Sequence, residues 1–326
     1  MLKIKCRAML KLFACSLLVL FPGFVGSGIA ADFPAKPVTL IVGFSAGGGT
    51  DTYGRAIASV ANDVMGQPMV VVNKPGAGGV IAAQFVASGR PDGYTLYHAS
   101  AGSFILKAMF KKLPVDPFED FKVVGIVGKL STGLVVPANS PFETAEELIA
   151  YAKKNPGKLR WAHTGRGNFH HVAGMGFLLK NGITAQDVPF NGGAKTRAAV
   201  VGEQVDFGFM GPQQVTGFEE QMRVLGLTLE ERDKAKSEFP TFKELGIPFV
   251  EVTSPITVMA PAGISPDVLK TLSDAVVEMT QHKAFLKMLG NAGLAPDSKG
   301  SEEGEKYLLK LKEDWAPVVD FIKQEQ

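Results

Sequence analysis

The stretch that decides the fold is VTLIVGFSAGGGTD, residues 38–51, in which an apolar run leads directly into a glycine-rich turn. The run VTLIV predicts a buried strand, and residues 51–62 predict a helix that opens at the glycines. The turn has two interpretations. GFSAG fits the G-x-S-x-G nucleophile elbow of a serine hydrolase, with Ser45 as the nucleophile. Alternatively, the turn directs backbone N–H groups at an anion.

The hydrolase interpretation lacks its expected surroundings. A nucleophile elbow needs a histidine base and an acid later in the chain, and an oxyanion loop upstream. Only a short segment precedes Ser45 after the export signal described below, and the histidine nearest the C-terminus, His282, opens a predicted helix. We therefore keep the secreted hydrolase as the alternative and favour the anion-binding turn.

The anion-binding interpretation rests on backbone chemistry. Gly47, Gly48 and Gly49 have no Cβ, so a ligand can approach the main chain. Their N–H groups and that of Thr50 lie at a helix N-terminus, which suits a carboxylate as well as a phosphate. The sequence contains neither phosphate-binding glycine motif of nucleotide sites, and we expect Asp51 to cap the helix or hold a water. From these residues alone, a plain tight turn without a ligand remains equally open.

The N-terminus predicts an export signal over residues 1–31. A basic start precedes an apolar run, 12–25, and small residues close the segment, with cleavage expected after Ala30 or Ala31. This pattern predicts that the protein is exported. Both cysteines, Cys6 and Cys15, fall in the signal, so the mature chain is expected to contain no disulfide and no thiol nucleophile.

Charge argues against a nucleic-acid partner. The chain carries 34 Lys and Arg against 32 Asp and Glu, and four of the basic residues belong to the signal segment, which has no acidic residue. The mature chain is therefore slightly acidic, and bulk electrostatics gives no reason to expect binding to DNA or RNA.

Short apolar runs alternate with helical patterns along the mature chain, which predicts an α/β protein with parallel sheets in two lobes. The predicted strands are 38–42, 69–72, 95–98, 133–137, 159–164, 187–190, 205–210, 223–229 and 256–261. The predicted helices are 51–62, 80–88, one from the capping box Thr144–Glu147 to Pro156, 169–180, 266–280, 282–289 and a C-terminal helix. Ligands of such folds bind at the carboxyl ends of the strands, where the glycine-rich loops lie.

Three further features are candidates for function. Arg166 lies between two glycines after a strand, where it either binds a ligand carboxylate bidentately or lies in solvent. Asp206 lies in an apolar strand, where a carboxylate needs a partner or a cleft. Histidines 163, 170 and 171 have no carboxylate or cysteine at ligand spacing, so we expect no metal site.

Several segments in order resemble the Bug family, the periplasmic solute-binding proteins of tripartite tricarboxylate transporters. The matching segments are FPAKPVTLIVGFSAGGGTD (33–51), VVNKPGAGGVIAAQFVASGRPDGYTL (71–96), KNPGKLRWAHTGRGNFHHVAG (154–174), VPFNGG (188–193), GEQVDFGF (202–209), FPTFKELGIP (239–248) and APAGISPDVLKTL (260–272). Together they span almost the whole mature chain.

The resemblance implies a two-lobed type II periplasmic-binding fold, the venus flytrap. Lobe 1 would take residues 32–127 with 252–326, and lobe 2 would take 128–251. Residues of both lobes would close on a small di- or tricarboxylate. Our expected ligand-binding residues are Phe44, Ser45, Ala46, Gly47, Gly48, Gly49, Thr50, Asp51, Ser100, Thr164, Gly165, Arg166, Gly167, Asn168 and Asp206.

The same resemblance implies a monomeric receptor without cofactor, metal or catalysis, which delivers its ligand to the membrane subunits of a transporter. A carboxylate sensor that signals to a membrane kinase has the same sequence features. The chain departs from the family at Asn191, where a lysine is usual, and at Arg166, where the residue is usually small or uncharged. These departures leave the ligand open.

Overall fold

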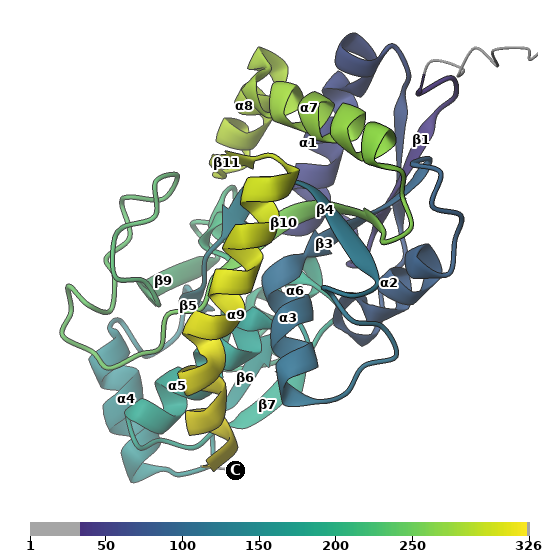
Figure 1. Ribbon diagram of the computed structural model, residues 1–326. Coiled ribbons are helices and arrows are strands. Elements are labelled where there is room, and N and C mark those ends of the chain that lie inside the picture. The colour runs from purple at the N-terminus through teal and green to yellow at the C-terminus, as the bar shows by residue number, and fades with distance from the viewer. Residues whose placement is uncertain (1–32, 325–326) are drawn as a thin grey trace, which may run out of the picture. The chain divides into compact units, whose positions relative to one another are not determined.

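The computed structural model describes residues 33–324 (Figure 1). The predicted export signal, residues 1–31, lies outside this range. None of the helices between residues 33 and 324 combines the length and hydropathy that a bilayer span requires.

The first sheet has six strands in the order β11-β4-β10-β3-β1-β2. Its strands are β1 (Val38–Val42), β2 (Met69–Asn73), β3 (Thr95–Ser100), β4 (Phe121–Leu130), β10 (Ser254–Pro261) and β11 (Pro296–Lys299). Strands β2, β1 and β3 run parallel, whereas β10 pairs antiparallel with both β3 and β4. The expected parallel pairing is found for β2, β1 and β3 but does not extend to β10, because β10 returns to this sheet from the second one in the opposite direction.

The helices α1 (Gly49–Met65), α2 (Val80–Ala87), α3 (Ala101–Phe110), α7 (Pro266–Gln281), α8 (Lys283–Asn291) and α9 (Ser301–Gln324) accompany the first sheet. The long C-terminal helix α9, yellow in Figure 1, packs on β4 and α3 and also contacts α5 of the second sheet.

The second sheet has five strands in the order β7-β6-β8-β5-β9. These are β5 (Gly133–Pro137), β6 (Arg160–His163), β7 (Gln186–Pro189), β8 (Phe207–Met210) and β9 (Met222–Leu227), with helices α4 (Ala145–Lys154), α5 (Phe169–Lys180) and α6 (Gly193–Val201). Strand β5 is antiparallel to both of its neighbours. Trp161 and Phe207 stack at the centre of an apolar core that includes Phe177, Phe209 and Phe242.

Two strands, β4 and β11, and two α-helices, α3 and α6, were not predicted from the sequence. Gly125 and Gly128 interrupt the apolar pattern of β4, which made this central strand unrecognisable. Strand β4 runs to Leu130 and pairs there with Ser254, so the chain leaves the first sheet slightly after the lobe boundary predicted at 127/128.

Gly128 is required because α1 packs directly on β4. A Cβ at Gly128 would lie 2.1 Å from Tyr53 Cε1, and the buried Tyr53 is fixed by the hydrogen bond that its hydroxyl donates to the Ala295 carbonyl (2.6 Å). Strand β4 and helix α1 can therefore come into direct contact only because residue 128 has no side chain.

We expect Gly128→Ala to lower the free energy of unfolding by about 1–3 kcal/mol, because the ring of Tyr53 must move. The matched control is Gly290→Ala in the exposed part of α8, where a Cβ meets open space. There the change should stabilise by about 0.5–1 kcal/mol through helix propensity. Urea unfolding of both variants measures the two effects, and equal stabilities would contradict the packing argument.

Three of the five histidines, His98, His163 and His170, are buried, and His171 is partly buried. Burial lowers the pKa of His98 and His163 to about 4 and that of His170 and His171 to about 3. In the unfolded chain the pKa of histidine is about 6.5. Below pH 6.5 the unfolded chain therefore binds protons that the native chain does not, and acid favours unfolding.

We expect the free energy of unfolding to fall as the pH is lowered from 6.5 to 5, by up to about 1.4 kcal/mol per pH unit for each buried histidine. His171→Gln should make this slope shallower. Urea unfolding at a series of pH values measures the slope. A stability independent of pH in this range would show that these side chains are not held neutral.

Candidate functional site

The N-termini of four helices meet at one cavity. Its wall contains the starts of α1 and α3 beside the first sheet, and of α5 and α6 beside the second. The lining residues are Phe44, Gly48, Gly49, Thr50, Ser100, Ser103, Leu130, Thr164, Phe169, His170, Gly192, Gly193, Gly211, Gln213 and Gln214. The first-turn N–H groups of a helix have no acceptor inside the helix, so each start brings hydrogen-bond donors and partial positive charge to this point.

The glycine turn before α1 is shaped by a buried carboxylate. Asp51 accepts hydrogen bonds from the Gly47 N–H (2.9 Å), Arg55 Nε (2.8 Å) and Asn73 Nδ2 (2.8 Å). Asn73 Nδ2 also donates to the Phe44 carbonyl (3.0 Å), which fixes the other end of the turn. Burial alone raises the pKa of Asp51, but these bonds outweigh burial and leave that pKa below its ordinary value. Asp51 thus stays ionised and holds the turn open for the amides that follow.

A chain of hydroxyls joins the first sheet to α5. Ser100 Oγ donates to Ser103 Oγ (3.0 Å) and lies 2.7 Å from Ser254 Oγ. Ser103 Oγ in turn accepts from the Phe169 N–H (3.5 Å), at the start of α5. All these side chains are buried, so they form one wall of the cavity with adjustable donors and acceptors.

The opposite wall is formed by the loop after β6. Thr164 Oγ1 lies 2.9 Å from His170 Nδ1, and Asn168 Nδ2 donates to the Thr164 carbonyl (2.8 Å). His170 Nε2 has no hydrogen-bond partner of good geometry among the described residues. Because burial lowers the pKa of His170 to about 3, its ring is neutral and offers a polar atom without a charge.

The cavity is small and carries no side-chain charge. No aspartate, glutamate, lysine or arginine is among the lining residues. The space open to the centre of a water molecule is about 20 Å³, which suffices for roughly one water. The two walls are in contact: a Cβ at Gly49 would lie 2.6 Å from Gln213 Nε2 and 2.8 Å from Leu130 Cδ2. A larger molecule enters only if the walls separate.

The structure brings six of the fifteen predicted residues to the cavity: Phe44, Gly48, Gly49, Thr50, Ser100 and Thr164. Eight others lie in the same two loops without lining it: Ser45, Ala46, Gly47, Asp51, Gly165, Arg166, Gly167 and Asn168. Ser45 donates its N–H to the Asn191 carbonyl (3.4 Å), and Asn168 is fully buried behind Thr164. Asp206 lies in neither loop.

Two predicted site residues have partners outside the cavity. Arg166 is not among the lining residues; its guanidinium makes a bidentate pair with Asp187 (2.7 and 3.1 Å) and its side chain is 66% exposed. Asp206 accepts the Arg160 N–H (2.6 Å) at the start of β6 and β8, whereas the cavity lies beyond the strands' carboxyl ends. Its partner is therefore the backbone, and its role is structural.

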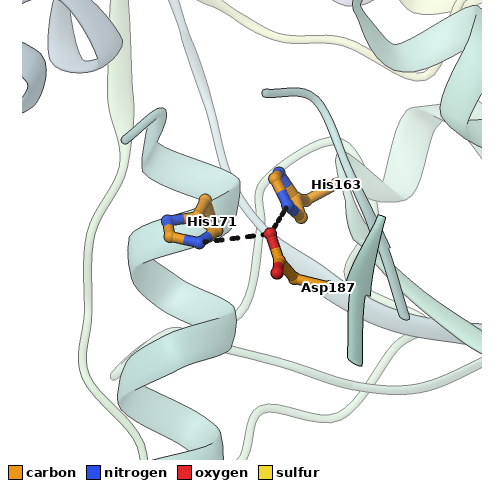
Figure 2. Close-up of side chains that lie close together, drawn as sticks. All are labelled: His163, His171 and Asp187. Atoms are coloured by element: carbon orange, nitrogen blue, oxygen red, sulfur yellow. Dashed lines mark hydrogen bonds and ion pairs between the residues drawn. The ribbon is translucent and has the colours of Figure 1, made fainter. Parts of the chain in front are cut away.

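Figure 2 shows a cluster of His163, His171 and Asp187. The sequence analysis found no carboxylate near these histidines, but the parallel pairing of β6 with β7 brings Asp187 to them. Asp187 Oδ2 lies 3.2 Å from His163 Nε2 and 4.0 Å from His171 Nε2. The hydrogen bond from Arg166 is the main cause that lowers the pKa of Asp187 to about 2, so the carboxylate is ionised.

The hydrogen bonds of the rings argue against a metal in this cluster. His163 Nδ1 accepts the Gly165 N–H (3.2 Å), and His171 Nδ1 accepts the Gly167 N–H (3.3 Å). Both neutral rings therefore carry their proton on Nε2, which faces Asp187. A cation among the three groups would need those Nε2 lone pairs. The cluster instead fixes the loop 164–168 to β7.

The sequence analysis missed nine lining residues: Ser103, Leu130, Phe169, His170, Gly192, Gly193, Gly211, Gln213 and Gln214. Gly192 and Gly193 carried a usable signal, because they precede a helix as Gly47–Gly49 do. Gly192 has φ +113°, a conformation that favours glycine. Gln213 and Gln214 lie in a short 3₁₀ turn, Pro212–Val215, which has no sequence pattern that marks a binding site.

Comparison with known proteins places this geometry in a family. Residues 54–323 match the family described as "Tripartite tricarboxylate transporter family receptor", TctC. The chain is 35% identical over 297 residues to "UPF0065 protein in gbd 5'region" of Cupriavidus necator, which covers 90% of this chain and 89% of the relative.

Two solved structures from Rhodopseudomonas palustris are similar, each with 26% identity. One, described "with adipate", has a TM-score of 0.84 and covers 90% of this chain and 99% of its own. The other, MatC "with bound malate", has a TM-score of 0.79 and covers 88% and 100%. The two-lobed periplasmic-binding fold predicted from the sequence is confirmed by these matches. The chain belongs to the TctC family of receptors, which includes the Bug proteins.

Proposed function

We propose that the protein is a periplasmic receptor that captures a small dicarboxylate in the cavity and presents it to the membrane subunits of a tripartite tricarboxylate transporter. The observation that carries this proposal is the meeting of four helix N-termini at a cavity without charged side chains. Such amides bind oxyanions without a basic side chain.

The arrangement of donors favours a ligand with two acidic ends. The starts of α1 and α3 face the starts of α5 and α6 across the cavity, so anionic groups at both ends of a short molecule each meet free amides. Adipate and malate, named with the two similar structures, are molecules of this kind.

We further propose lobes of residues 32–127 with 252–326, and 128–251, with the first crossing shifted to follow Leu130. The lobes separate to admit the ligand, because the cavity as it stands holds only about one water. Ligand that contacts both lobes shifts the population toward the closed form, which the membrane subunits would recognise.

Calorimetric titration with adipate, malate and the uncharged adipamide tests the proposal. We expect saturable binding of at least one dicarboxylate and none of adipamide. Gly48→Asp should then abolish most of this binding: Gly48 caps α1 with extended geometry (φ −87°, ψ 166°), so the new carboxylate occupies the place of the ligand's anion.

Gly48→Asn is the matched control, because it adds a cap of the same shape without the charge. We expect the aspartate variant to bind the dicarboxylate about tenfold or more weakly than the asparagine variant, while both keep or raise the thermal stability. Equal affinities in the two variants would contradict an anion at the start of α1.

We also propose that the protein is not a hydrolase. Helix α1 begins at Gly49, four residues after Ser45, rather than directly behind the serine as in a nucleophile elbow. None of the hydrogen bonds found among residues 33–324 joins Ser45 Oγ to a histidine.

Incubation with a fluorophosphonate probe, followed by intact mass measurement, distinguishes the two functions. We expect no adduct, because a serine without a base is not an activated nucleophile. Stoichiometric labelling that disappears in Ser45→Ala would favour the enzyme.

A further inference from the structure

A second cavity lies between α3, α5 and α9 and shares no lining residue with the first. It is lined by Lys107, Phe110, Lys111, Arg166, Gly167, His171, Val172, Met175 and Ile322, and its volume is about 200 Å³. These residues come from α3, the loop 164–168, α5 and α9, so the cavity is built by segments far apart in the sequence.

One face of this cavity has an excess of positive charge. Lys107 is only 7% exposed, and within residues 33–324 no carboxylate lies within 4.0 Å of its ammonium. The ammonium donates a hydrogen bond to the carbonyl of Arg166. Lys111, directly after the end of α3, also lines the cavity, whereas the charge of Arg166 is already balanced by Asp187.

Burying the charged ammonium of Lys107 costs free energy unless an anion lies beside it. Burial, with a further effect of the nearby charge on Lys111, lowers the pKa of Lys107 to about 8, so the side chain remains mostly charged at neutral pH. A buried ammonium normally has a counterion or several acceptors. The side chain also has little freedom to leave, because it packs against Gly78 and Gly167.

Four of the other lining residues are apolar. Val172 and Ile322 are almost fully buried, and Phe110 and Met175 extend the same surface. An engineered cavity of about 150 Å³ in another protein holds a benzene ring. A space of about 200 Å³ therefore fits an apolar body of this size beside the lysines.

We propose that this cavity is a second binding site, separate from the carboxylate cavity, for a monoanion with an apolar body such as an aromatic carboxylate. The carboxylate bonds to the ammonium groups of Lys107 and Lys111 and supplies the missing counterion. The apolar body lies among Phe110, Val172, Met175 and Ile322.

Benzoate and its neutral analogue benzamide test this site. The protein is labelled with ¹³C at the methionine methyl groups, and Met175→Leu identifies the signal of Met175, which lines the second cavity. We expect benzoate to shift this signal saturably, benzamide at the same concentration to leave it nearly unchanged, and adipate not to displace benzoate.

Lysine variants on α3 and just after it distinguish a loss of binding charge from a loss of folded structure. Lys107→Met keeps the packed stem and should weaken benzoate about tenfold or more, since a hydrogen bond to a charged group is lost. Lys111→Gln at the exposed end should weaken it less, and Lys112→Gln, which lies outside the lining, should have no effect. Absence of a shift at Met175, equal binding of benzamide, or displacement by adipate would each overturn the proposal.

Discussion

The structure depends on the free amides at the starts of four helices. The first-turn N–H groups cannot bond within their own helices, and here residues of four helix starts line one small cavity. Glycine at 48, 49, 192 and 193 keeps side chains away from these donors. Because the positive potential comes from the backbone rather than from arginine or lysine, closing the cavity does not bury an unpaired cation. The walls can therefore approach until only about one water fits, and in the proposed function they separate again for a ligand.

The need to keep these amides unpaired also explains why a buried acid, Asp51, lies beside the proposed anion site. Asp51 would repel a carboxylate if its charge were free, but Arg55, Asn73 and the Gly47 amide bond to it, and it is not among the residues that line the cavity. Its charge is balanced locally, and its geometry holds the turn in the shape that leaves the next amides unpaired. Asp51 therefore supports the proposed anion site by positioning the turn rather than by contacting a ligand.

Much of the fold could be predicted from local chemistry, and the site only in part. Ser265 caps α7 ahead of Pro266, and Thr144 with Glu147 forms the capping box of α4, as their spacing indicates. Strand β4 could not be predicted, because its Gly128 makes sense only once Tyr53 is known to lie over it. The partner of Arg166 could not be predicted for a similar reason: Asp187 is distant in sequence and is brought to it by strand pairing. Local patterns thus predict turns and caps, whereas the partner of a charged side chain depends on tertiary contacts.

The loop 164–168 connects the two cavities physically. Thr164 lines the first, while Arg166 and Gly167 line the second, and the Arg166 carbonyl accepts a hydrogen bond from Lys107 on α3. His163 and His171 hold the Gly165 and Gly167 amides, so the loop has few ways to deform internally. If the walls of the first cavity separate, this loop moves away from α3 as a unit, and the contact with Lys107 is lost with it. Two ligands that each bridge the same pair of segments are then linked through one rigid element, and linkage of that kind acts equally in both directions.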